Sequence, residues 1–341
     1  MSDISNRKKD HVDLTVTNQT QYQTKTGFET YYFQHNALPE LDFDDISTQS
    51  SLLGYTFSFP LFISSMTGGY ADAGLVNNII AEFCETNNLP FGVGSQRAMV
   101  VDESHIDSFS VARKTAPNSF IAGNIGGVQL IESWNIDKTK KLIDTIEANA
   151  LIVHLNPLQE LMQPEGDRKF KGVLLGIEEL LKKANVPIIV KETGAGVSAN
   201  VAKRLLDAGV QVIDVSGSGG TSWAKVENQR LNNKRPQHLF DEWGIPTAEC
   251  LHQISSIQWE RGFEIISSGG IRTASDIAKS LCLGATFTAT AQPIIKAIKE
   301  NGIEGLDLYY TNLKKDFKTL LLLLGCASPK ELMRRHLLEK R

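Results

Sequence analysis

Short polar or glycine-rich segments follow apolar runs at eight places between residues 60 and 295. Their lysine, arginine, glutamate, histidine and amide side chains could bind anions and metals or move protons. In chain order they are Ser65–Gly69, Gly94–Arg97, Asn124 with Gly126–Gly127, His154–Glu160, Lys191–Gly194, Ser216–Thr221, Ser268–Arg272 and Ala291–Gln292. Eight such segments in register predict one site to which every run contributes.

The last two segments predict a phosphate site. Gly269 and Gly270 expose backbone N–H groups, and a helix starting near Thr273 would present the positive end of its dipole. Arg272 could add a charge-assisted contact. Many barrel proteins bind phosphate at this position, so the pattern indicates a phosphorylated ligand of no particular kind.

Lys191 ends a buried apolar run, where a bare ammonium is costly. It could form a Schiff base, act as a general base or place a positive charge beside a flavin. The alternative is a structural salt bridge, to Glu160 or Asp214.

Three further groups have both a functional and an ordinary interpretation. Glu160 could bind Mg²⁺, which prefers one or two carboxylates with phosphate oxygens and water, or it could be a surface group or helix cap. His154 could contact a ligand or lie at the barrel rim. Arg7, Lys8 and His11 could clamp a diphosphate together with Arg97, or they could belong to a solvated terminus.

The elements that must position these residues alternate between strand and helix. The apolar runs are 61–65, 91–93, 120–123, 151–154, 187–190, 212–215, 264–267 and 286–290. Amphipathic helices are predicted at 72–87, 137–148, 198–208 and 273–281, with Ser198 and Thr273 as N-caps. Eight βα units predict an α/β chain folded as a (β/α)8 TIM barrel, whose catalytic face lies after the strands.

Three regions follow from this pattern. Residues 1–59 form an N-terminal arm and barrel cover, 60–300 the barrel, and 301–341 a C-terminal extension of two helices broken near Ala327–Pro329. A long insert after the sixth run lies on the catalytic face and is predicted to be a lid. It carries Trp223, Lys225, Glu227, Arg230, Lys234, Arg235 and Trp243.

Composition excludes several other classes. The 341 residues carry a formal net charge of −4 and lack a dense basic stretch, which argues against nucleic acid. The four cysteines form no CxxC pair, so a zinc or dithiol site is not expected. The longest aliphatic run, Leu320–Leu324, is too short for a membrane span. A cytoplasmic protein without membrane contact is expected.

These segments together resemble the type 2 isopentenyl diphosphate isomerases. The resemblance extends from residue 7 to about residue 300. Its most specific parts are Arg7-Lys8-Lys9-Asp10-His11 and Asn156-Pro157-Leu158-Gln159-Glu160, because related flavin barrels share the glycine loops but lack these two segments. The other matching segments are Ser65–Gly69, Gly94–Arg97, Lys191-Glu192, Ser216–Trp223 and Ser268–Arg272.

The resemblance implies an FMN- and Mg²⁺-dependent interconversion of isopentenyl and dimethylallyl diphosphate without net redox change, with NADPH as reductant. It implies a homotetramer or homo-octamer. Gln159 would face the reacting end of the substrate, with His154 as a second candidate catalytic residue, and Glu160 would bind Mg²⁺. The diphosphate would contact Arg7, Lys8, Ser95, Gln96, Arg97 and Gln159. The implied FMN contacts are Ser65, Met66, Thr67, Ser95, Asn124, Lys191, Ser216, Thr221, Gly269, Gly270, Arg272, Ala291 and Gln292.

Three alternatives are less well supported. A 2-hydroxy-acid oxidase would have a histidine and an arginine close after the sixth strand, where this chain has Ser216–Gly220. An inosine monophosphate dehydrogenase would have a nucleophilic cysteine in that loop, yet Cys250 lies well beyond it. A non-catalytic phosphate-binding barrel would not require the full set of polar strand ends.

Overall fold

The computed structural model describes residues 3–70, 72–131, 136–231, 239–257 and 262–340. Eight parallel strands close into a barrel, in the order β10-β11-β4-β5-β6-β7-β8-β9. They are β4 (Leu61–Ile63), β5 (Phe91–Gly92), β6 (Ile121–Gly126), β7 (Ala150–Leu155), β8 (Ile188–Glu192), β9 (Val212–Asp214), β10 (Glu264–Ser267) and β11 (Phe287–Thr290). The predicted (β/α)8 barrel is confirmed.

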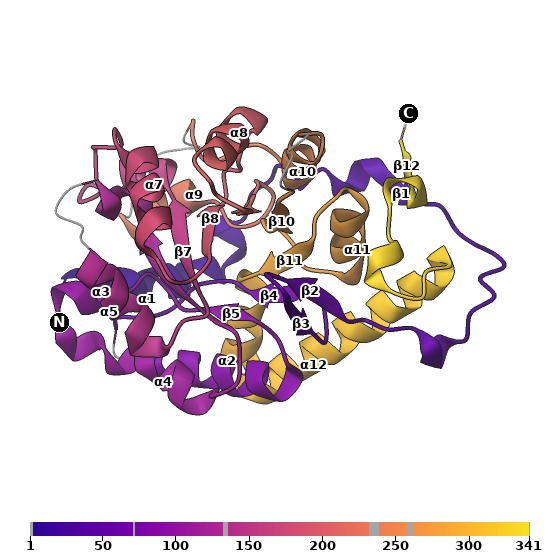
Figure 1. Ribbon diagram of the computed structural model, residues 1–341, viewed down its shortest axis with the longest axis horizontal. Helices are drawn as coiled ribbons and strands as arrows, with labels where there is room; N and C mark the ends of the chain where they lie inside the picture. Colours follow the sequence, from indigo (N-terminus) through magenta and orange to yellow (C-terminus); the bar gives the residue numbers. More distant parts are fainter. Residues whose placement is uncertain (1–2, 71, 132–135, 232–238, 258–261, 341) are drawn as a thin grey trace.

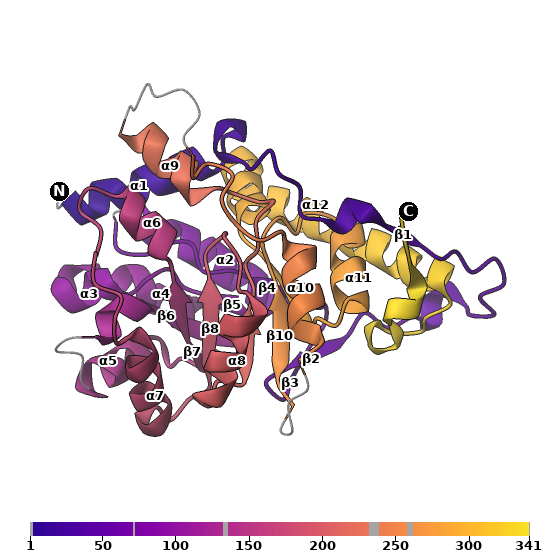
Figure 2. The same cartoon turned by 90° about the horizontal axis from the view of Figure 1, so that it is seen from above.

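Helices surround the barrel on its outside (Figures 1 and 2). They include α2 (Ala73–Asn87), α4 (Asp107–Thr115), α5 (Ile136–Ile146), α7 (Val173–Lys183), α8 (Ala199–Asp207), α10 (Thr247–Ser255), α11 (Ala274–Cys282) and α12 (Gln292–Leu324). Both predicted N-caps are confirmed, because Ser198 accepts the N–H of Val201 and Thr273 accepts the N–H of Asp276. These caps satisfy backbone donors that the first helical turn leaves unpaired.

Aromatic side chains close one end of the barrel. Inside it, Phe62, Phe120 and Phe287 pack with aliphatic residues of the strands. A hairpin of β2 (Ser50–Leu52) and β3 (Tyr55–Phe57) inserts Phe57, whose ring centroid lies 5.8 Å from that of Phe120 and 5.7 Å from that of Phe287. The N-terminal end of the barrel is therefore filled with apolar side chains.

The N-terminal arm begins with helix α1 (Asp3–Thr15), which lies beside α9 (Trp223–Arg230) in Figure 2. Strand β1 (Tyr31–Phe33) then pairs antiparallel with β12 (Leu337–Glu339), near the C-terminus. The prediction of a second C-terminal helix was wrong, because residues 329–336 form two short 3-10 turns before β12. Backbone pairing with the distant arm takes the place of local helical hydrogen bonds. No helix in the described part of the chain is long and apolar enough to span a membrane.

Helix α12 crosses the predicted boundary at residue 300. Asn301 and Gly302 have non-helical backbone angles, and Gly302 has φ +60°, so the helix is kinked there. The regions 1–59, 60–300 and 301–341 stay a prediction about domains, while the kink falls where barrel and extension were expected to meet.

Candidate active site

Two adjoining cavities open where the strands end. The first, here called the flavin cavity, is lined by the loops after β4, β8, β9, β10 and β11. The second, here called the arm cavity, is lined by α1, by the loops that follow β4 and β5, by β6, and by residues between His154 at the end of β7 and Gln163. Both are lined by His11, Ser65, Met66, Lys191, Thr193 and Trp223.

Glycines bring the loops after β9 and β10 into close backbone contact. Gly269 has φ +96°, and a Cβ there would lie 2.1 Å from the carbonyl oxygen of Gly217. Gly270 has φ +76°, and a Cβ on Gly220 would lie 2.6 Å from the Gly270 nitrogen. Since L side chains avoid such backbone angles and have no room here, both loops require glycine. They leave a cavity wall made largely of backbone.

The phosphate end of this cavity differs in one respect from the prediction. The first turn of α11 is closed by its own capping box, and Asp276 accepts the N–H groups of Arg272 and Thr273. Helix α12 starts at Gln292 without a side-chain cap. Ala291 and Gln292 line the cavity, so the positive helix end available to a phosphate belongs to α12.

Arg272 contributes a guanidinium at the same end. It donates to the carbonyl of Gly219 at 3.2 Å and to Oε1 of Gln21 at 2.6 Å. Burial lowers the pKa of Arg272 below its ordinary value. Thr221 also donates to Gln21, at 3.3 Å, so the arm helps to close the cavity.

Lys191 lies inside β8 and lines both cavities. Its Nζ donates to the carbonyl of Glu192 at 2.5 Å and lies 3.8 Å from Oδ2 of Asp214. Of the two salt-bridge partners considered, the structure has Asp214. Lys191 makes these contacts and also lines the flavin cavity, so the structural and functional interpretations of Lys191 are compatible.

The buried hydroxyl of Ser65 indicates that the cavity accepts a polar ligand. Its Oγ has no hydrogen-bond partner among the described residues and belongs to a residue that lines both cavities. Buried polar atoms are almost always paired, so a ligand hydrogen bond would explain this hydroxyl. Together with the glycine loops and Lys191, Ser65 fits an FMN site.

Three basic side chains line the arm cavity in addition to Lys191. Lys8 donates to the carbonyls of Gly68 at 2.6 Å and Ser95 at 2.9 Å. Burial, with Arg7 beside it, lowers the pKa of Lys8 to about 7. Arg7 and Arg97 also line the cavity. The structure therefore brings the predicted arm cluster and Arg97 into one place.

Glu160 lies in α6 (Pro157–Met162), where a loop was predicted. Its Oε1 accepts from Asn156 at 3.0 Å and its Oε2 from the N–H of Asp167 at 2.8 Å. Asn156 also donates to Gln159 Oε1 at 3.1 Å. Both side chains line the arm cavity in fixed orientations. Within the described residues no cluster of three His, Cys, Asp or Glu could hold a metal, so any Mg²⁺ here would need oxygens from its ligand.

His154 is neutral in this environment. Burial, followed by the charges of Lys191 and Lys8, lowers its pKa to about 3. Its Nδ1 lies 2.7 Å from Oδ1 of Asn124, which accepts the imidazole N–H. Nε2 is then an acceptor, at a residue that lines the arm cavity.

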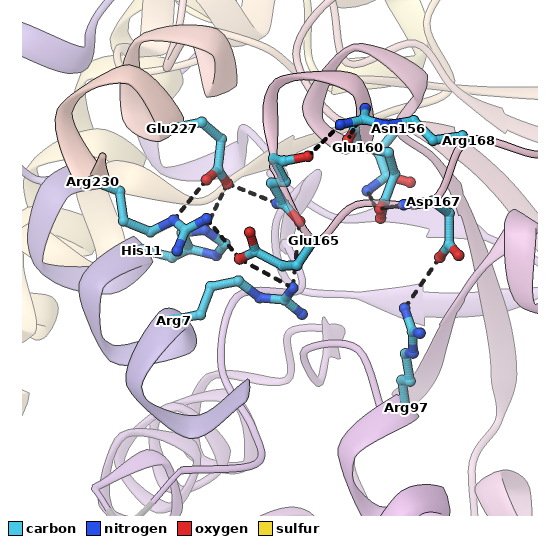
Figure 3. Close-up of polar contacts among 11 residues, drawn as sticks. Arg7, His11, Arg97, Asn156, Glu160, Glu165, Asp167, Arg168, Glu227 and Arg230 are labelled. Carbon is cyan, nitrogen blue, oxygen red and sulfur yellow. Dashed lines mark hydrogen bonds and ion pairs between the residues drawn. The ribbon is translucent and has the colours of Figure 1, made fainter. Parts of the chain in front are cut away.

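A charged network joins the arm to α9 and to the loop after α6 (Figure 3). His11 Nε2 lies 2.7 Å from Oε1 of the fully buried Glu227. Burial raises the pKa of Glu227, but His11 and Arg230 outweigh it and bring the value below its ordinary range. Glu165 lies between Arg7, at 3.6 Å, and Arg230, at 2.6 Å. The long insert therefore covers the site as α9, while Lys234 and Arg235 lie outside the described residues.

Two predicted site residues do not line either cavity. Thr67 donates to Asn77 at 2.5 Å. Gln96 is fully buried, donates to the Leu142 carbonyl at 3.0 Å and accepts the Asn124 N–H at 3.0 Å. Both therefore support the loops instead of facing a ligand. The other predicted residues line at least one cavity.

Three residues that follow α6 were not predicted from the sequence. Gln163 lines the arm cavity and donates to Glu227 at 2.7 Å. Asp167 pairs with Arg97 at 3.2 Å, and Arg168 donates to the Glu160 carbonyl at 2.8 Å. A helix starting at Pro157 would have placed Gln163 on the same side as Glu160, because residues three apart are neighbours on a helix.

Comparisons with known proteins agree with this geometry. The FMN-dependent dehydrogenase family model matches residues 154–339. Flavocytochrome b2 shares the fold with a TM-score of 0.71 at 19% identity, over 97% of this chain and 82% of that one. The (S)-mandelate dehydrogenase of Pseudomonas putida does so at 0.68 and 17%, over 99% of both chains.

Curated relatives are much more similar. Isopentenyl-diphosphate delta-isomerase of Chlorobaculum parvum is 42% identical over 96% of this chain and 94% of its own. The isomerase of Nostoc sp. is 42% identical over 94% of this chain and 92% of its own. With this identity over nearly the whole length and an FMN-type barrel, the chain belongs to the FMN-dependent, type 2 isopentenyl-diphosphate delta-isomerases.

Proposed function

We propose that the chain interconverts isopentenyl and dimethylallyl diphosphate, with reduced FMN in the flavin cavity, Mg²⁺ at Glu160 and no net redox change. One observation carries this proposal. Four basic side chains, Arg7, Lys8, Arg97 and Lys191, and a single oriented carboxylate line the cavity that adjoins the flavin cavity, with Gln159 and His154 in the same wall. Cations and one carboxylate suit a magnesium diphosphate.

Within the flavin cavity, Ser65 would donate its unpaired hydroxyl and Lys191 would face the ring. The phosphate would lie against Gly269, Gly270 and Arg272 and the start of α12. When bound, reduced FMN would supply the acid–base chemistry of the reaction.

Within the arm cavity, Arg7, Lys8 and Arg97 would bind the diphosphate, and Glu160 would hold the metal against it. Moving the double bond requires one proton to be added to carbon and another removed from a neighbouring carbon. The Oε1 atom of Gln159 is fixed by Asn156, and His154 is neutral. Both side chains can therefore orient the hydrocarbon end of the substrate without acting as strong acids. The arm and α9 would exclude water from the reacting carbons.

The oxidase alternative is disfavoured by the same geometry. The loop that follows β9 presents Ser216, Gly217, Gly220 and Thr221 to the cavity, with no histidine or arginine to grip a carboxylate.

An anaerobic assay tests the proposal. Purified protein, FMN, Mg²⁺, NADPH and isopentenyl diphosphate should yield dimethylallyl diphosphate, with no stoichiometric consumption of NADPH. FMN-loaded protein that gives no product would contradict the isomerase assignment and leave the cofactor site standing. NADPH as the reductant and assembly into four or eight copies stay predictions, to be checked by flavin reduction and by light scattering.

A further inference from the structure

A polar groove adjoins the phosphate end of the flavin cavity. It lies between the N-terminal arm, which contributes Asn18 and Gln21, and the kinked helix α12. The groove has a volume of about 760 Å³, which is within the ~300–1,000 Å³ typical of small-molecule sites. The kink at Asn301 and Gly302 turns the second half of α12 and lets both halves of the helix line it. None of the roles assigned above uses this groove.

The groove and the flavin cavity share a wall of side chains. Arg272, Gln292 and Pro293 line both. The guanidinium of Arg272 donates to Gln21 at 2.6 Å across this wall. The barrier there is made of side chains, and Gln21 is held in it by hydrogen bonds to the carbonyls of Thr15 and Thr17 as well as from Arg272. Displacing Gln21 from these contacts would connect the two spaces, with Arg272 at the junction.

The groove offers the contacts that an adenine nucleotide needs. Amide side chains of Asn18 and Asn312 can hydrogen-bond base edges and ribose hydroxyls. Lys296 supplies a half-exposed ammonium, whose nearest carboxylate, Glu300, lies 3.8 Å away. Tyr309 adds an aromatic ring, fixed by a 3.0 Å hydrogen bond from its hydroxyl to the Arg272 carbonyl.

We propose that the protein also accepts FAD, with the flavin in the same cavity as FMN, the pyrophosphate at Arg272 and the adenylate in the groove. A free pyridine dinucleotide fits this position less well, because its nicotinamide could reach the flavin ring only through the space that the FMN phosphate fills. The inference rests on the FMN site of the proposed function, but it does not depend on the isomerisation.

A competition experiment on the full-length holoprotein tests this. The protein is equilibrated with equal concentrations of FMN and FAD, freed of unbound flavin and heated, and the released flavins are separated by chromatography. Wild-type protein should release FAD and FMN in a ratio within tenfold of one. Lys296→Glu and Leu308→Trp should each lower that ratio at least tenfold while leaving FMN content unchanged, since both residues line the groove and neither lines the flavin cavity.

Lys315→Glu is the matched control, because it makes the same charge change on α12 outside the groove, and it should leave the ratio unchanged. A wild-type ratio of FAD to FMN below 0.1 would overturn the inference. So would FAD uptake that is insensitive to both groove variants, since the adenylate would then lie in solvent. Protein that retains neither flavin would refute the flavin site itself, whereas FMN without FAD would refute only this inference.

Discussion

Replacing Lys191 by methionine separates its structural role from its cofactor role. Methionine keeps most of the apolar stem inside β8 and removes the ammonium. The loss leaves Asp214, which is 3% exposed, without its cation. Asp214 retains hydrogen bonds from the N–H of Ser216 at 3.2 Å and the hydroxyl of Ser268 at 2.5 Å.

The cost in stability follows from the 3.8 Å separation of Lys191 Nζ and Asp214 Oδ2. At an effective dielectric of about 20 the attraction is roughly 4 kcal/mol. Breaking a buried pair by removing one partner typically costs about 3–5 kcal/mol. We therefore expect Lys191→Met to lower the melting temperature by about 6–10 °C, at roughly 2 °C per kcal/mol for a chain of this size.

The loss of folding stability in Lys191→Met should depend on pH, and the direction of this dependence can be derived. Burial raises the pKa of Asp214 and Lys191 opposes that rise, so in the variant the folded-state pKa rises further above the unfolded value. The folded variant then binds more protons than the unfolded chain, and its stability falls as pH rises from about 4 toward the raised pKa. The loss should be smallest in acid. Adding Asp214→Asn should restore stability at neutral pH.

Flavin affinity should not recover in the double variant. Loss of a charged hydrogen bond to the ring, worth about 1.5–3 kcal/mol, corresponds to a roughly 10- to 150-fold larger dissociation constant for FMN. Fluorescence titration of FMN and thermal unfolding of the single and double variants measure the two effects. Wild-type FMN affinity in the stabilised double variant would refute the cofactor role of Lys191.

The remaining predictions concern the metal, the arm and the glycine loop. Glu160→Gln should abolish most Mg²⁺-dependent turnover with FMN still bound, and an unchanged Mg²⁺ titration would contradict its metal role. Since Lys8 loses its proton near pH 7 in the free protein, kcat/KM should fall above that pH. Lys8→Arg should flatten this limb, and an identical profile would rule Lys8 out as its source. Gly269→Ala should lose most bound FMN, because its Cβ would clash with Gly217, whereas Gly54→Ala, at φ +79° with no neighbour within 4 Å, should retain it. Equal flavin content in the two variants would contradict the claim that FMN binding requires the close contact between Gly269 and Gly217.

The barrel was predictable because each of its strands is a local signal. Runs such as Leu151–Val153 are buried on both faces, so they are apolar throughout, and strand ends such as Ser268–Gly270 contrast with them. Ser198 and Thr273 could be identified as N-caps from residue type alone. These features depend on neighbours within a few positions of the chain.

What could not be predicted depends on distant partners. Strand β12 exists because β1 pairs with it from about 300 residues away, and nothing near Leu337 signals that pairing. Gln96 stands in a motif beside Ser95 and Arg97, yet its side chain points inward to Leu142. A motif gives residue types in order but does not give the direction of each side chain.

The two cavities differ in what builds them, and this difference explains how a common fold supports a particular reaction. The flavin cavity has one wall of glycine loops after β9 and β10, whose close approach depends on backbone geometry. Flavocytochrome b2 has the same fold at only 19% identity. The arm cavity instead takes its charges from α1, α6 and the loop after β5. Because none of those side chains belongs to a barrel strand, they can differ between proteins that share the barrel.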